Sequence, residues 1–387
     1  MKATVLTGLD RFSRYDARKY RGARFGLLAH QASVSRELQH TIDVVTARGC
    51  HLRAVFAPEH GLSGTEQALR PVGSERLRRL PVYSLYGNQL RPTPEMLAGL
   101  DFFLFDLQDV GSRYYTYIST MLYCFRACGE ANVEFIVLDR PNPIGGKVME
   151  GNLIEPTHLS YVGIHPLPAR HGMTVGEIAL MFKDQLSLRG KLTVIPMTGW
   201  KRDNWYDETN LPWVMPSPNM PTLDTATVYP GMCLLEGTNL SEGRGTTRPF
   251  ELFGAPWLDS ARVAQFLRGC RLPGLVFRET RFKPTFNTYS GEVCHGFQMH
   301  VVDRLRFKPY LTAIAILQGC RAIHKKKFAW RPPPYEYETI KLPIDILLGS
   351  SSLRRMIENE IPIREIERGW REKLDVFARV RRHFLLY

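Results

Sequence analysis

The ten residues 52–61, LRAVFAPEHG, end an apolar run of strand length with a carboxylate and an imidazole side by side. Glu59 and His60 lie between Pro58 and Gly61, and neighbouring groups of these two types can exchange protons in general acid–base catalysis. The alternative is a structural pair whose polar atoms are satisfied inside the fold. A helix cap would need only one of the two groups, so the pattern favours a catalytic role.

Two further apolar runs also end in polar clusters. The run at 101–106 leads into DLQDVGSRYYTY, and the run at 134–139 leads into DRPNPIGG. The residues with useful chemistry in these two clusters are Asp106, Asp109, Arg113, Tyr114, Tyr115, Tyr117, Asp139, Arg140 and Asn142. Each type also has a structural interpretation. The aspartates can cap a following helix, the arginine can pack its stem on the surface, and the tyrosines can belong to the core.

The runs that position these residues alternate with helical patterns over the first 200 residues. Strands are predicted at 24–30, 52–57, 81–86, 101–106, 134–139 and 192–197, and helices at 38–49, 93–100, 117–131 and 174–186. Thr174 and Glu177 open the last helix with the spacing of a capping box. Near-continuous apolar strands separated by helices predict a Rossmann-like three-layer α/β domain with a mostly parallel sheet. Ligands bind outside the carboxyl ends of such strands, so the three polar clusters are expected to share one cleft.

Residues 203–255 differ in composition from the first 200 residues. They are rich in Pro, Gly, Asn and Trp and show little hydrophobic periodicity. A loop region of this length is usually functional or a domain junction, and both interpretations remain open here. Its candidate site residues are Asn219, Glu236, Asn239, Glu242 and Arg244. Beyond it, apolar runs at 274–286 and 294–304 and a helical pattern at 309–325 predict a smaller α+β domain. We therefore predict a catalytic domain over 1–250 and a C-terminal domain over 251–387.

Composition narrows the class of protein. The formal net charge is +13, but the basic residues are interspersed with acids and no nucleic-acid-binding motif is present, so no nucleic-acid partner is predicted. No apolar stretch reaches membrane-spanning length, so no membrane insertion is predicted. The seven cysteines show no CxxC spacing and are expected to be buried, reduced thiols. The expected location is the cytoplasm, and the alternative is an exported protein whose leader is absent from this sequence.

Other catalytic chemistries have weaker support. Glu59, His60, Asp106, Asp109 and His171 could supply metal ligands, but no two histidines have the i, i+4 spacing of a zinc helix. No metal or other cofactor is therefore predicted, and a metal-dependent hydrolase remains the alternative. No serine-hydrolase elbow, Walker loop or dinucleotide fingerprint is present. Abundant Asn, Glu, Arg, Tyr and Trp in the polar segments favours recognition of a carbohydrate.

Several blocks taken together resemble the exo-β-N-acetylmuramidase family of peptidoglycan glycosidases. They are FAPEHGLSG, FDLQDVGSRYYTYISTM, LDRPNPIGG, EGN, PLPARHGMTVGEIA, PSPNMPTLDTATVYPG, EGTNLSEGRGTTRPFELFGAPW and the closing LPIDILLGS and LLY. The match runs in order from about residue 24 to Tyr387. The resemblance implies a Rossmann-like catalytic domain, a smaller C-terminal domain, and release of N-acetylmuramic acid from the non-reducing ends of peptidoglycan fragments. A non-catalytic muropeptide-binding protein is the second alternative.

The resemblance also implies roles for individual residues. Glu59 matches the family's proposed catalytic glutamate and could act as a general acid beside His60. A 2-acetamido sugar can use its own acetamide as nucleophile, and Asp106 or Asp109 would then orient that amide. Arg113 or Arg244 would bind the lactyl carboxylate. The predicted catalytic residues are Glu59, His60, Asp106 and Asp109. The predicted substrate-binding residues are Arg113, Tyr115, Tyr117, Asn142, His171, Asn219, Glu236, Asn239, Glu242 and Arg244. The sequence makes no prediction of oligomeric state.

Overall fold

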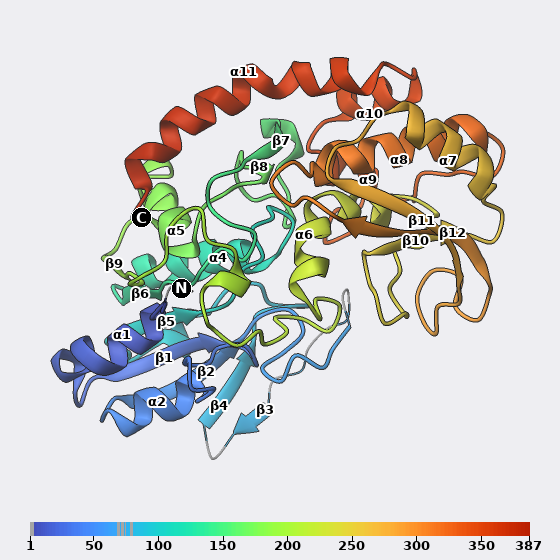
Figure 1. The fold of residues 1–387 in the computed structure, drawn as a ribbon. Helices are drawn as coiled ribbons and strands as arrows, with labels where there is room; N and C mark the ends of the chain where they lie inside the picture. Colours follow the sequence, from blue (N-terminus) through green and yellow to red (C-terminus); the bar gives the residue numbers. More distant parts are fainter. Residues whose placement is uncertain (1–3, 68–69, 71–72, 74, 78–79) are drawn as a thin grey trace.

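The fold is that of a computed structural model that describes residues 4–67, 70, 73, 75–77 and 80–387. Within these residues the larger sheet has seven strands in the order β3-β4-β2-β1-β5-β6-β9 (Figure 1). Neighbouring strands from β4 to β9 are parallel, and β3 runs antiparallel to β4. The strands are β1 (Arg24–Ala29), β2 (His51–Ala57), β3 (Glu75–Leu77), β4 (Leu80–Ser84), β5 (Phe102–Asp106), β6 (Glu134–Leu138) and β9 (Leu192–Ile195). All six predicted strands are present, and the mostly parallel α/β fold is confirmed.

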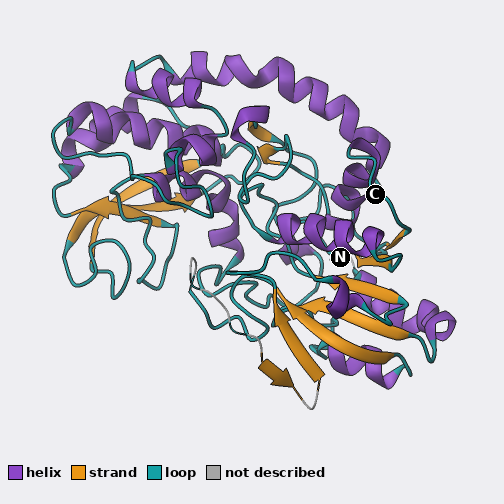
Figure 2. Cartoon of the chain, turned by 180° about the vertical axis from the view of Figure 1, so that it is seen from behind, coloured by secondary structure: helices purple, strands orange, loops and turns teal. Residues whose placement is uncertain are grey.

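Helices cover both faces of this sheet (Figures 1 and 2). Leu27 packs in a cluster with α1 and α2, whereas its neighbour Leu28 packs in the cluster that holds α4 and α5. Successive side chains of a strand point to opposite faces, so a continuous apolar run fills two cores at once. The covering helices are α1 (Gly8–Arg11), α2 (Thr41–Ala47), α3 (Pro94–Leu97), α4 (Tyr117–Glu130) and α5 (Val175–Gln185). The predicted capping box of α5 is present between Thr174 and Glu177.

The C-terminal half carries a smaller antiparallel sheet in the order β10-β12-β11, flanked by helices. The strands are β10 (Leu252–Ala255), β11 (Leu275–Phe282) and β12 (Cys294–Val301). The helices are α7 (Ser260–Gly269), α8 (Pro309–Ile323), α9 (Pro343–Leu348), α10 (Ser351–Glu358) and α11 (Ile363–Arg381). This α+β arrangement confirms the predicted class of the second domain.

Two features of the fold are absent from the predictions. A two-stranded sheet pairs β7 (Glu150–Leu153) with β8 (Pro168–Arg170), and α6 (Leu223–Met232) lies in the segment predicted to lack periodicity. The helix α6 contains Pro230, a residue that normally signals a helix end because it cannot donate a backbone hydrogen bond. Gly231 follows it, and a side chain there would collide with the backbone carbonyl of Pro309 in α8. The Pro-Gly pair therefore permits close packing of α6 against α8 and does not mark a turn.

Several contacts fasten the two halves together. The helix α6 packs against α8, although the predicted domain boundary at residue 250 assigns them to different domains. The Glu150 carboxylate of β7 accepts hydrogen bonds from the first backbone amides of α8, Tyr310 N at 3.3 Å and Leu311 N at 2.9 Å. That position suits an anion because the amide groups of a helix start are unpaired and positive. The boundary itself stays a prediction.

The long helix α11 runs from the C-terminal half back to α5 and β9 of the first half (Figure 1). At its end, the Arg381 guanidinium donates to the Gly172 carbonyl at 2.8 Å, and the Tyr387 hydroxyl donates to Asp139 at 2.8 Å. Burial raises the pKa of the Asp139 carboxyl to about 6, against the opposing effect of hydrogen bonds from Gly176, Thr174 and Tyr387. Asp139 thus anchors the end of the chain.

Two sequence predictions concern sulfur and membranes. All seven cysteines are free; six are buried, as predicted, and Cys270 is half-buried. No helix within the described residues is both long and apolar enough to cross a membrane.

Candidate active site

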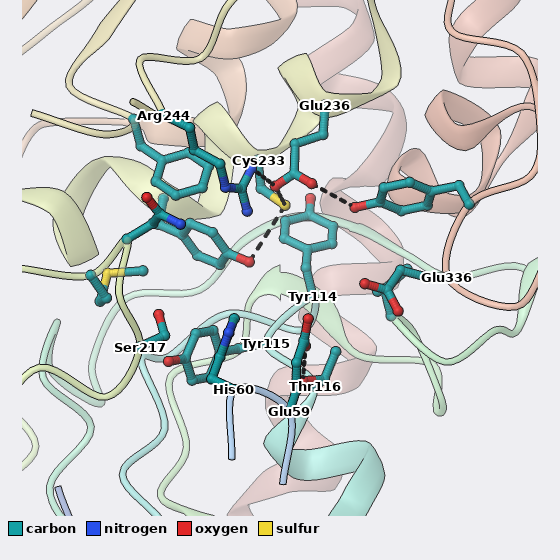
Figure 3. Close-up of a pocket in the computed structure, with 16 residues that line it drawn as sticks. Glu59, His60, Tyr114, Tyr115, Thr116, Ser217, Cys233, Glu236, Arg244 and Glu336 are labelled. Atoms are coloured by element: carbon teal, nitrogen blue, oxygen red, sulfur yellow. Dashed lines mark hydrogen bonds and ion pairs between the residues drawn. The ribbon is translucent and has the colours of Figure 1, made fainter. Parts of the chain in front are cut away.

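A cavity opens where the carboxyl edge of the parallel sheet meets the C-terminal half (Figure 3). We call it the inner cavity; its volume is about 40 Å³. It is lined by Glu59, His60, Tyr114, Tyr115, Thr116, Val162, Ser217, Asn219, Met220, Tyr229, Cys233, Glu236, Arg244, Phe250, Tyr335 and Glu336. A wider outer cavity of about 310 Å³ shares Glu236 and Arg244 with it. The outer cavity is also lined by Gln67, Arg70, Glu242, Phe286, Asn287 and Arg331.

Glu59 reaches the inner cavity from the end of β2. Its side chain is buried, and Oε2 accepts a hydrogen bond from the Thr116 hydroxyl at 2.7 Å. Thr116 occupies the N-cap position of α4, yet its side chain makes no cap bond and turns to Glu59 instead. The carboxylate therefore lies beside the start of a 14-residue helix, where the helix dipole favours negative charge.

His60 is held in a defined proton arrangement. Its Nδ1 lies 2.7 Å from the Glu66 carbonyl oxygen, which can only accept, so Nδ1 carries a proton. In the neutral ring Nε2 is then the acceptor. The backbone of His60 has φ of 73°, a left-handed conformation that costs a residue with a side chain about 1 kcal/mol or more. The turn after β2 is thus strained in a way that presents both side chains to one space.

Glu336 enters the inner cavity from the loop 332–338 of the C-terminal half (Figure 3). The Tyr86 hydroxyl donates to its two carboxylate oxygens at 3.2 and 3.1 Å. Its φ of 45° is also left-handed. Burial, followed by the charges of Glu59 and Glu236, raises the pKa of the Glu336 carboxyl well above its usual value, although the Tyr86 hydrogen bond and Arg244 oppose this.

Arg244 forms a compact ion cluster between the two cavities. Its Nη1 lies 2.8 Å from Glu236 and 3.1 Å from Glu242, and its guanidinium carbon lies 4.7 Å from the ring centre of Phe250. Burial works against the charge, but the two carboxylates raise the pKa of Arg244 well above its usual value. Burial likewise raises the pKa of Glu242, with Arg244 opposing. The cluster is held together by charge and carries one more negative than positive group.

Polar side chains complete the cavity wall. The Asn219 amide donates to Gln67 Oε1 at 2.8 Å, and Ser217 lies two residues before it in the loop PSPNMP. The buried Tyr114 hydroxyl has no hydrogen-bond partner within the part of the chain that the structure describes. A buried hydroxyl without a partner is unfavourable, so Tyr114 is ready to bond a ligand.

The two predicted aspartates at and after the end of β5, Asp106 and Asp109, line neither cavity. Asp106 is fully buried, and its two oxygens accept from Arg140 Nε at 2.5 Å and Nη2 at 2.8 Å, with a further bond from Thr41. This two-point ion pair links β5 to the segment after β6. Asp109 accepts from Gly111 N at 2.6 Å and lies 3.3 Å from His171 Nε2. The geometry of Asp106 matches its structural interpretation, whereas Asp109 Oδ1 is buried without a hydrogen-bond partner among the described residues, so the role predicted for Asp109 stays a prediction.

Four further predicted residues also bind the protein itself. Arg113 is buried, and its terminal nitrogens donate to the carbonyls of Leu167, Leu347 and Leu348 at 2.8–3.1 Å and to that of Asn152. Tyr117 donates to Pro216 O at 2.6 Å, Asn142 to Met173 O at 3.0 Å, and Asn239 to Lys327 O at 2.8 Å. Arg113 thus clamps the end of α9, Tyr117 positions the loop PSPNMP, and none of the four lines either cavity.

Sequence reasoning singled out six residues of the inner cavity: Glu59, His60, Tyr115, Asn219, Glu236 and Arg244. It missed Glu336, Ser217 and Thr116, and it gave no site role to Tyr114. A signal for Glu336 existed in PPPYEYE, where three prolines precede a glutamate flanked by two tyrosines. It also missed His30, directly after β1, whose ring bridges Gln108 N at 3.1 Å and Pro216 O at 3.2 Å. Because Pro216 opens the loop PSPNMP, His30 helps to position Ser217 and Asn219.

On fold and site alone, the chain is an α/β protein with a carboxylate-lined, tyrosine-walled cavity suited to a polar, hydroxyl-rich ligand. No group of three or more His, Cys, Asp or Glu side chains that could hold a metal ion occurs among the described residues.

Comparisons with known proteins narrow this class. The family described as exo-beta-N-acetylmuramidase NamZ matches through its N-terminal part at residues 25–224 and through its C-terminal part at residues 227–387. The chain is 41% identical over 390 residues to the peptidoglycan beta-N-acetylmuramidase NamZ of Bacillus subtilis (strain 168), covering 100% of this chain and 92% of that protein. Two crystal structures of DUF1343 family proteins from Bacteroides fragilis NCTC 9343 share the fold. Their TM-scores are 0.88 and 0.77, their identities 34% and 26%, and each match covers 99% of both chains.

The chain therefore belongs to the exo-β-N-acetylmuramidase NamZ family, as the motifs predicted. The two family matches meet between residues 224 and 227, ahead of the domain boundary predicted at residue 250.

Proposed function

We propose that this protein is an exo-acting glycoside hydrolase that releases N-acetylmuramic acid from the non-reducing ends of peptidoglycan fragments. Membership of the NamZ family supports the reaction and the substrate class. The observation that carries the proposal is Glu59, held at the end of β2 beside the start of α4 and facing a cavity of polar side chains. Glycoside hydrolysis needs a carboxyl group of this kind at the scissile bond.

The size of the site suits an enzyme that works from a chain end. The inner cavity, about 40 Å³, has room for a few water molecules, since each needs about 10–15 Å³ in this measure. A sugar ring must therefore use the outer cavity as well or displace side chains between the two. A cavity of this size favours entry of a terminal sugar residue over an internal segment of a glycan.

Binding of the lactyl carboxylate needs an accessible cation. Arg113 is enclosed by carbonyl groups, and Arg244 already contacts Glu236 and Glu242. The outer cavity offers two exposed arginines, Arg70 and Arg331, and the Arg331 backbone amide donates to the Gly237 carbonyl, directly after Glu236, at 2.9 Å. We assign the lactyl carboxylate to Arg331, while Arg244 keeps Glu236 and Glu242 in place.

The test is an assay of the purified protein with a chromogenic β-N-acetylmuramide and with the disaccharide of N-acetylmuramic acid β-1,4-linked to N-acetylglucosamine. Release of N-acetylmuramic acid from both is expected. Binding of the sugar without release would favour a muropeptide-binding protein instead. Activity that a strong chelator abolishes and zinc or magnesium restores would favour the metal-dependent hydrolase. Cell fractionation decides between the cytoplasmic and exported locations, because both are compatible with this reaction.

A further inference from the structure

The inner cavity holds more negative than positive groups. Its lining includes three carboxylates, Glu59, Glu236 and Glu336, and the only guanidinium or ammonium group in that lining belongs to Arg244. Arg244 is committed to Glu236 and to Glu242 behind it. In the described part of the chain neither Glu59 nor Glu336 contacts an arginine or lysine. Ionising two carboxylates in one buried site costs free energy because their charges repel each other. One of the two therefore holds a proton.

The surroundings place that proton on Glu336. Its carboxyl group is buried among aromatic rings: Tyr86, Tyr161 and Tyr337 contact one another with ring centres 5.2–6.0 Å apart. Glu59, in contrast, lies beside the start of α4 and accepts a hydrogen bond from Thr116. An apolar site favours the neutral acid, and a helix start favours the anion. Burial and the charges of Glu59 and Glu236 raise the pKa of Glu336 in agreement with this division.

Glu336 is also held in position by the other half of the molecule. The Tyr86 hydroxyl bonds both of its oxygens, and the Gly87 amide donates to the Tyr337 hydroxyl at 2.9 Å. Tyr86 and Gly87 follow β4 of the parallel sheet, whereas Glu336 lies in the C-terminal half. A left-handed φ at both Glu336 and Tyr337 shows that these contacts outweigh local backbone preference. Strain of this kind clusters at functional sites.

We propose that Glu336 is the second catalytic carboxylate and donates the proton to the leaving oxygen, with Glu59 as its ionised partner. The inference rests on the proposed glycosidase function. The proton passes from Glu336 to the glycosidic oxygen as the bond from the anomeric carbon breaks, and the bonding electron pair stays on that oxygen. The leaving fragment departs as an alcohol. Glu59 stabilises the positive charge at the anomeric carbon, water adds there, and the proton of that water returns to Glu336.

The test uses the leaving group as a readout. Glu336→Gln should lower kcat for the natural disaccharide by about 10²–10⁴-fold. A nitrophenyl glycoside leaves without much help from an acid, so Glu336→Gln should lose far less activity on that substrate. Glu338→Gln is the matched control on the same loop: Glu338 accepts from the Ile340 and Lys341 amides and does not line the inner cavity, so both rates should stay near wild type.

Each other outcome has a defined meaning. Equal losses on both substrates, or activity near wild type on the disaccharide, overturn the acid assignment. Failure of the wild-type protein to release N-acetylmuramic acid overturns the proposed function instead. A thermal melt shows whether each variant is folded.

Should Glu336→Gln not fold, Tyr86→Phe supplies a second test. The Tyr86 hydrogen bond favours the ionised form of Glu336. Its loss should raise the pKa of the acid and move the alkaline limb of kcat/KM to higher pH, because a general acid works only while protonated. An unchanged alkaline limb, or one that moves to lower pH, contradicts the assignment.

Discussion

Two polar clusters lie at the same edge of the parallel sheet and differ in how their charges are compensated. In the network at the end of β5, Asp106 is bound by Arg140 at two points and by Thr41, and all three side chains are buried. In the inner cavity, Glu59 has a threonine hydroxyl as its partner and Glu336 a tyrosine hydroxyl. The difference is that between a paired and an unpaired buried carboxylate.

This comparison shows what distinguishes a carboxylate that supports the fold from one that can react with a ligand. When an arginine binds a buried carboxylate at two points, the charge of the carboxylate is neutralised within the protein. Such a pair holds two strands together. A carboxylate bonded only by a hydroxyl keeps most of its charge, or its proton, for a ligand. Both kinds of carboxylate lie at a strand end. Their roles therefore differ according to whether a neighbouring cation neutralises the charge.

The largest effect should come from Glu59→Gln, which tests the unpaired side of the comparison. The amide can still accept from Thr116, but it cannot stabilise positive charge or transfer a proton. We expect kcat to fall by about 10²–10⁴-fold on the disaccharide and on the nitrophenyl glycoside alike, with little change in unfolding midpoint. Steady-state kinetics and denaturant unfolding are the measurements. A kcat near wild type would remove Glu59 from the mechanism.

Asp106→Asn tests the paired side and should show the reverse pattern. It leaves the Arg140 guanidinium buried without its anion, and breaking a buried pair costs about 3–5 kcal/mol of unfolding free energy. The fraction that folds should keep a kcat close to wild type.

The control is Asp101→Asn, because Asp101 also pairs with an arginine, Arg24 at 2.7 Å, but at the exposed amino ends of the strands. Its unfolding midpoint should move little. A large loss of kcat in folded Asp106→Asn protein would contradict the division between the two clusters.

The smallest effect should distinguish an arginine that binds the lactyl group from one that holds neighbouring carboxylates in place. Arg331→Met should raise KM for the muramide about 10-fold through loss of a charge-assisted bond to the lactyl group. It should leave KM for the corresponding N-acetylglucosaminide unchanged, because that sugar lacks the lactyl group. Arg244→Met, in contrast, should impair both sugars alike, since it leaves Glu236 and Glu242 without their cation. A selective effect of Arg244→Met would return the lactyl group to Arg244.

The fold was largely predictable because its signals are local. Continuous apolar runs of strand length such as FGLLA and FIVL indicate strands that are covered on both faces, and the Thr174–Glu177 spacing marks a helix start. The helix α6 escaped prediction because Pro230 and Gly231 serve packing against α8. Local preference is a poor guide where a tertiary contact decides the conformation.

The site was predictable only in part, for a physical reason. The motif PEHG marks Glu59 because a strand end and a strained turn are encoded in adjacent residues. The partners that neutralise or bind a buried polar side chain are distant in the sequence. The sequence does not reveal that Arg140 pairs with Asp106, or that Arg113 binds the carbonyl groups of α9. Glu336 was missed for the same reason, since Tyr86, which holds it, is 250 residues away.

The bonds of Arg113 and of Arg381 have a mechanical consequence. Arg113 fastens the two halves at the end of α9, and Arg381 fastens them again at the far end of α11. Together with the packing of α6 against α8 and the bonds of Glu150 to the start of α8, these two separated contacts oppose a broad opening between the halves. Admission of a sugar and departure of products must then rely on a short piece of chain.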